Sequence, residues 1–79
     1  GDIEGIKQDI SGGYPVITFV DLGVWGIRKG HYMLIVGYDD ERGGIIAYSG
    51  IERDKFISYD RFLRMWERGG YWTLSVVPN

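Results

Sequence analysis

The strongest constraint on the fold is a series of short β-rich runs separated by glycine and polar turns. Such runs lie at residues 15–20, 31–38, 44–49 and 71–77, and they are rich in β-branched and aromatic side chains. Only the polar segment 39–43 separates the second run from the third. Parallel neighbours need a connection of a dozen residues or more. The central runs therefore predict an antiparallel hairpin.

Two helices are expected beside these strands. The first helix would begin at Asp2, a plausible N-cap, and end at the glycine pair 12–13. Its apolar face follows helical spacing at Ile3, Ile6 and Ile10. The second is capped by Ser58 and ends at the Gly-Gly pair 69–70, with its apolar face formed by Tyr59, Phe62, Leu63 and Trp66. The sequence thus predicts an α+β fold, with an antiparallel sheet of three to four strands and two flanking helices.

Length and composition limit the classes of function that the chain can have. The 79 residues allow one domain, 1–79, and the hydrophobic content of 44% with twelve aromatic residues is that of a folded chain. A net charge of -2 provides no basic field for nucleic acid, and no apolar run approaches the roughly 20 residues that span a bilayer. We therefore expect neither nucleic-acid binding nor membrane insertion.

The absence of cysteine removes several chemistries. Without it the chain has no disulfide, no thiolate zinc site and no nucleophilic thiol of its own. The acidic turn 39–41 lacks the alternating ligands of a calcium loop, so a solvated turn is the simpler interpretation. We expect no metal and no cofactor.

His31 is the single histidine and the first candidate for chemistry. It begins the second β-rich run, directly after a glycine-rich loop that carries Trp25, and a rigid strand can hold a general base there. The alternative is a strand-end histidine that packs against its neighbours and bonds a backbone carbonyl.

A catalytic imidazole needs a group that fixes its orientation. If Tyr38 faces Gly44 across a five-residue turn, Ser49 lies on the His31 side of the sheet and Tyr48 on the other, although a slip of one residue exchanges them. Asp21, at the end of the first run, is a further candidate. The structural alternatives are a turn former for Ser49, a core residue for Tyr48 and a loop cap for Asp21.

Several segments together resemble a known family. They are Gly13-Tyr14-Pro15-Val16-Ile17, Gly30-His31-Tyr32-Met33-Leu34-Ile35-Val36-Gly37-Tyr38-Asp39, Gly44-Ile45-Ile46-Ala47-Tyr48-Ser49-Gly50, and Tyr59-Asp60-Arg61-Phe62-Leu63 with Trp66. This pattern resembles the C-terminal, histidine-bearing half of papain-like cysteine peptidases of the bacteriocin-processing type, which cleave leader peptides at double-glycine sites, and of related stand-alone peptidases.

The resemblance implies the barrel half of a papain-like fold, the C-terminal part of a larger peptidase domain, and His31 as the imidazole that activates a cysteine. The cysteine would come from an upstream helical segment. The Asp-Pro expected near residues 48–49 is replaced by Tyr48-Ser49, so Ser49 or Asp21 would orient the ring.

Further expectations follow for partners. Trp25 and Tyr48 are candidate substrate contacts, and the partners would be a peptide or leader peptide and either the cysteine-bearing segment or a second copy of the chain. Alone, the chain is expected to be inactive. The alternative function is a non-catalytic peptide- or protein-binding domain of the same fold.

Overall fold

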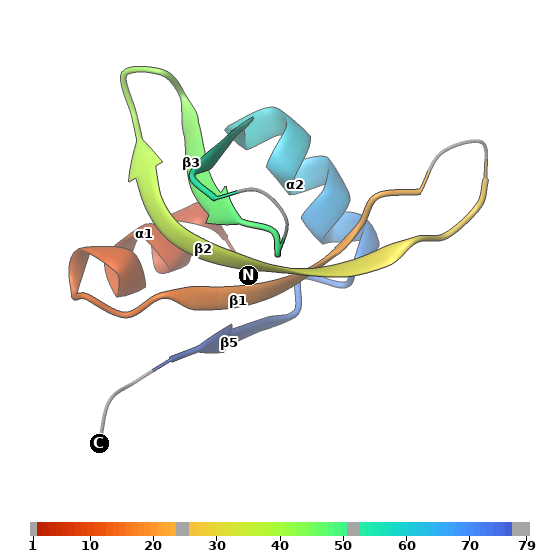
Figure 1. Cartoon of the computed structure of the whole chain (residues 1–79), viewed down its shortest axis with the longest axis horizontal. Coiled ribbons are helices and arrows are strands. Elements are labelled where there is room, and N and C mark those ends of the chain that lie inside the picture. The colour runs from red at the N-terminus through yellow and green to blue at the C-terminus, as the bar shows by residue number, and fades with distance from the viewer. Residues whose placement is uncertain (1, 24–25, 51–52, 77–79) are drawn as a thin grey trace.

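The computed structural model describes residues 2–23, 26–50 and 53–76 and contains two helices and five strands (Figure 1). The elements, in chain order, are α1 (Ile3–Ser11), β1 (Val16–Asp21), β2 (Gly30–Asp39), β3 (Gly44–Tyr48), β4 (Lys55–Ser58), α2 (Tyr59–Arg68) and β5 (Thr73–Ser75). Both helices follow the predicted signals. Asp2 accepts a hydrogen bond from the Gly5 amide at 2.8 Å, and Ser58 accepts one from the Arg61 amide at 3.3 Å.

The strands form one antiparallel sheet in the order β4-β3-β2-β1-β5. This confirms the α+β prediction and its antiparallel centre. The predicted three to four strands are five, because Lys55–Ser58 forms a further strand that pairs along its whole length with β3. Of the predicted last strand, 71–77, the described part forms β5 at Thr73–Ser75, which pairs with β1, and residue 77 lies outside the described residues.

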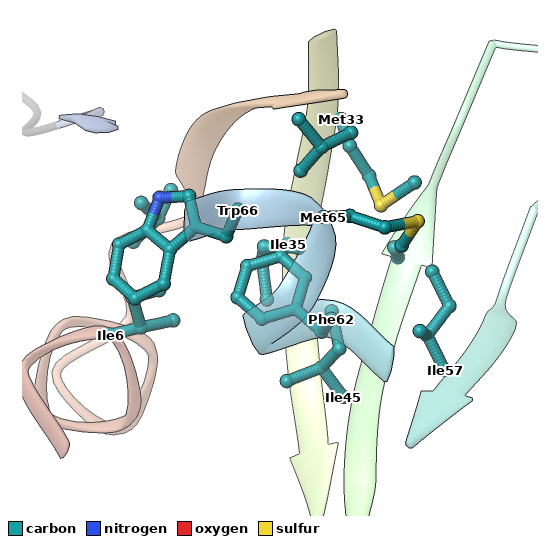
Figure 2. Close-up of a cluster of buried hydrophobic side chains, with 11 residues drawn as sticks. Ile6, Met33, Ile35, Ile45, Ile57, Phe62, Met65 and Trp66 are labelled. Carbon is teal, nitrogen blue, oxygen red and sulfur yellow. The ribbon is translucent and has the colours of Figure 1, made fainter. Parts of the chain in front are cut away.

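Both helices pack on the same face of the sheet. In Figure 2, Trp66 and Phe62 of α2 fill the space between the strands and α1, and the indole contacts the Ile6 side of α1. Trp66 and Phe62 are 1% and 0% exposed, and their rings stack with centroids 5.4 Å apart. The two side chains are therefore core anchors, as their helical spacing predicts. The strands contribute Val16, Val20, Met33, Ile35, Ile45, Ala47 and Ile57 to this core.

The β2–β3 hairpin differs from the predicted register near its turn. Gly44 pairs with Asp39, not with Tyr38, so the turn has four residues. The Asp39 carboxylate stabilises this turn by accepting hydrogen bonds from the amides of Glu41 and Arg42, both at 3.1 Å. Beyond a register shift between Ile35 and Gly37, Leu34 faces Tyr48, which is the pairing that the predicted register also gives there.

The other face of the sheet carries apolar side chains that neither α1 nor α2, the two helices of the described residues, covers. Tyr32, Val36, Tyr48, Trp72 and Leu74 are all exposed large hydrophobic residues on the strands or beside them. Rings from three segments meet there in edge-to-face contacts, because Phe19 lies 5.1 Å from Tyr32 and Tyr32 lies 5.7 Å from Trp72 between centroids. We call this the open face.

Candidate functional site

His31 is the second residue of β2, at the end of the strand that follows the connection from β1. Its cross-strand partner is Val20, whose side chain is buried in the core. The imidazole therefore leaves the sheet on the helix-covered face. It is partly buried and lines a hollow of about 190 Å³.

One hydrogen bond fixes which nitrogen of the His31 ring carries the proton. Nε2 of His31 lies 3.2 Å from the main-chain oxygen of Ser49. A carbonyl oxygen can only accept, so this contact requires the proton on Nε2. In the neutral ring Nδ1 then keeps the lone pair, which makes Nδ1 the nitrogen that can accept a proton.

Ser49 is thus brought to His31, but through its backbone. The predicted role for the residue did not specify which atom would hold the ring, and the structure supplies the carbonyl. Tyr48 lies on the opposite face, across from Leu34, where it lines a separate hollow with Leu34 and Val36. Its hydroxyl donates to the Gly50 carbonyl at 3.4 Å. Tyr48 and His31 are therefore not neighbours in one site.

Asp21 is not brought to the imidazole. Its cross-strand partner is Gly30, so its side chain leaves the sheet on the face opposite to His31. The carboxylate Oδ1 accepts from the amides of Gly23 at 2.8 Å and Lys29 at 3.0 Å, which closes the β1–β2 loop. The backbone hydrogen bonds from Lys29 and Gly23 lower the pKa of Asp21 below its ordinary value. This geometry is that of a loop cap, the structural alternative for this residue.

The predicted substrate contact Trp25 lies outside the described residues. Lys55 and Arg61 add two cationic groups to the hollow beside His31, and neither is among the predicted site residues. Arg61 and Met65 stand four residues apart on α2, and this spacing could have placed both on the face that meets the sheet. The full lining is Leu22, His31, Met33, Ser49, Lys55, Ile57, Arg61 and Met65.

Residues 2–23, 26–50 and 53–76 contain no group of three or more histidine, aspartate or glutamate side chains that could hold a metal ion. Over the same ranges, neither helix has the length and apolar character needed to cross a membrane.

Comparison with known proteins gives one informative structural match. No protein-family model matches the chain, and no curated protein matches it by sequence. Among solved structures, a crystal structure described as "putative C39-like peptidase from Bacillus anthracis" superposes with a TM-score of 0.78 at 16% sequence identity. The match covers 99% of this chain and 48% of that one.

The chain has the fold of about half of that C39-like protein. At this level of identity the match shows the fold, and it agrees with the architecture that the sequence resemblance implied. It also relates the chain to C39-like peptidases in structure.

Proposed function

We propose that this chain is the histidine-bearing half of a papain-like cysteine peptidase and supplies its general base, His31. The observation that carries the proposal is the contact between His31 Nε2 and the Ser49 carbonyl at 3.2 Å. It orients the ring and leaves Nδ1 as the basic nitrogen, on a partly buried residue beside a hollow. These are the properties of a positioned base.

The reaction would be acyl transfer. Nδ1 of His31 would take the proton of a cysteine thiol from the other half, and the resulting thiolate would attack a peptide carbonyl. The imidazolium would then return that proton to the leaving amine, and water would hydrolyse the thioester. The Ser49 carbonyl accepts from Nε2 in both charge states of the ring, so the orientation is preserved through the cycle.

A partner half is supported by the structural match, because the chain spans about half of the C39-like protein. We propose that a helical cysteine-bearing segment is the partner, that it presents its cysteine at the hollow lined by His31, and that a peptide of the double-glycine leader type is the substrate. A second copy of the chain is the competing partner, and the five exposed apolar side chains of the open face are the surface it would cover.

The test uses the whole natural polypeptide that contains these residues. Peptide cleavage and the rate of thiol alkylation by iodoacetamide would be measured against pH. We expect His31→Ala to lower kcat/KM at least a thousandfold and to move the alkylation midpoint toward about 8.5, the ordinary pKa of a thiol. Ser49→Ala is the matched control, because it retains the carbonyl that holds the ring, and it should change activity only a few-fold.

Two results would refute the proposal. One is a natural polypeptide that has no cysteine in its other half. The other is peptide cleavage that His31→Ala leaves intact.

A non-catalytic peptide-binding domain is the second candidate, and one observation favours it. The group that holds the His31 ring is a neutral carbonyl, not a carboxylate, so the imidazolium form gains less stabilisation than in an aspartate-containing triad. Binding of a leader peptide by the whole polypeptide, without cleavage and without change in His31→Ala, would select this function.

A further inference from the structure

A second hollow lies on the side of β2 away from the imidazole. It has a volume of about 330 Å³ and is formed where the end of β1, the start of β2 and the C-terminal end of α2 meet. We call it the arginine pocket, and its lining residues are Phe19, Asp21, Arg28, Gly30, Arg68, Gly69 and Gly70. Gly30 directly precedes His31 in β2, so the pocket and the imidazole lie on opposite faces at the same end of the strand.

The charges of the pocket do not cancel. Arg68 Nη2 donates to the main-chain oxygen of Asp21 at 3.1 Å, which fixes one guanidinium at the wall. Arg28 Nε lies 4.0 Å from Asp21 Oδ2, and the Arg28 side chain is 89% exposed. Two guanidinium groups thus face one carboxylate, whose Oδ1 is already engaged by the loop amides. The local balance is one positive charge, in a chain whose net charge is negative.

The floor of the pocket is close-packed backbone and one aromatic ring. A Cβ at Gly30 would stand 2.4 Å from the Phe19 ring, and one at Gly69 would stand 2.3 Å from the Phe19 carbonyl oxygen. A side chain at Gly69 would meet backbone, and one at Gly30 would displace the Phe19 ring, so the two glycines leave the main chain open at the surface. The result is an open depression with an apolar base and a cationic rim, the arrangement of small-ligand sites in which a few polar groups fix orientation.

We propose that the arginine pocket binds a single carboxylate group of a peptide. A guanidinium presents paired N–H donors that match a carboxylate, and only one of the donors of Arg68 is used by Asp21. The fixed Asp21 carboxylate beside them opposes a doubly charged phosphate, whereas one carboxylate neutralises the excess charge. The proposal rests on the proposed function for the class of ligand, a peptide, and adds a carboxylate-binding position outside the hollow that holds the imidazole.

The experiment measures binding by the chain itself, so it does not depend on catalysis. Three blocked peptides would be titrated and followed by amide NMR shifts of Gly30, Gly69 and Gly70: N-acetyl-Gly-Gly-Glu amide, its Gln counterpart, and N-acetyl-Gly-Gly with a free C-terminal carboxylate. We expect the Glu peptide or the free acid to bind at least about tenfold more tightly than the Gln amide. Whichever peptide binds more tightly than the Gln amide shows whether the pocket takes the carboxylate of a side chain or of a chain end.

Variants separate the pocket from general charge. Arg28→Gln should weaken carboxylate binding about tenfold, whereas Arg64→Gln, the same change on the exposed surface of α2, should not. His31→Ala should leave binding unchanged, so failure of the proposed catalysis and failure of this proposal are distinguishable. Equal binding of the Glu and Gln peptides, an equal effect of both arginine variants, or tighter binding of inorganic phosphate would overturn it.

Discussion

Trp66 should contribute more to stability than any other side chain of α2. An aromatic side chain of this size buries roughly 150 to 250 Å², which at about 25 cal/mol per Å² corresponds to about 4 to 6 kcal/mol. Core substitutions of this kind cost about 3 to 5 kcal/mol. Trp66 is 1% exposed and its Nε1 donates to the Trp72 carbonyl at 3.2 Å, so we place Trp66→Ala at the upper end of that range.

The whole domain is small, and its stability is on the order of 4 to 12 kcal/mol. Trp66→Ala should therefore remove much of it, and Trp66→Phe serves as the milder variant that stays folded. The assay is urea denaturation followed by circular dichroism, with the free energy of unfolding extrapolated to water. Trp66→Phe should cost about 1 to 2 kcal/mol, because it keeps the ring stack on Phe62 and loses the indole hydrogen bond.

Trp72→Ala is the matched control. Trp72 is 44% exposed and contacts the Tyr32 ring at its edge, so its loss should cost about 1 kcal/mol while the main-chain acceptor for Trp66 stays in place. If Trp66→Ala and Trp72→Ala prove equally destabilising, or if Trp66→Ala lies within about 0.5 kcal/mol of wild type, the reasoning from burial is wrong.

Three further outcomes are expected. The pKa of Asp21 is lower in the folded state than in the unfolded state, so its carboxylate stabilises the fold above the unfolded pKa of about 4, and this stabilisation is lost as pH falls through the lower folded pKa. The difference in unfolding free energy between wild type and Asp21→Asn, measured by denaturation from pH 7 to 2, should therefore shrink in acid. A difference that stays constant would contradict this linkage. Gly69→Ala should cost more than about 1 kcal/mol in the same assay, because a Cβ there meets the Phe19 carbonyl oxygen at 2.3 Å, and a neutral result would mean that β1 moves away freely. The isolated chain should show no peptidase activity between pH 5 and 9 because it has no thiol, and turnover that His31→Ala abolishes would show a different nucleophile.

The parts of the fold that the sequence predicts well are those with local causes. Helix α2 begins at a capping serine and ends at a glycine pair, and its apolar spacing identifies Phe62 and Trp66 as core residues. The register of the β2–β3 hairpin is harder to predict from the sequence. The turn is one residue shorter than predicted, and the register shift near Val36 compensates for this difference. Neither change has a strong local signal, since each depends on how the whole strand pairs with its neighbour.

The candidate site shows the same division. Alternation along the strands placed Ser49 on the His31 side and Tyr48 on the other. The sequence could not indicate that the Ser49 carbonyl would contact the ring, because a backbone contact leaves no trace in residue type. It also could not separate Asp21 from the imidazole, since that depends on which face the last residue of β1 presents. Arg28 and Arg68 meet at Asp21 from segments far apart in the chain, which no local pattern reveals.

The strand order has a consequence for synthesis on the ribosome. The outer edge of β1 is closed by β5, the last in chain order of the five described strands, and hydrogen bonds from the Phe19 amide to the Trp72 carbonyl and from the Val76 amide to the Pro15 carbonyl extend the pairing. Translation proceeds at about 5 to 20 residues per second, so β5 is synthesised roughly 3 to 11 s after β1. For that interval the nascent chain carries an apolar strand with free amide and carbonyl groups, the form that pairs with other chains. A chaperone that covers this edge during translation would therefore raise the yield of folded protein more than one that acts after release.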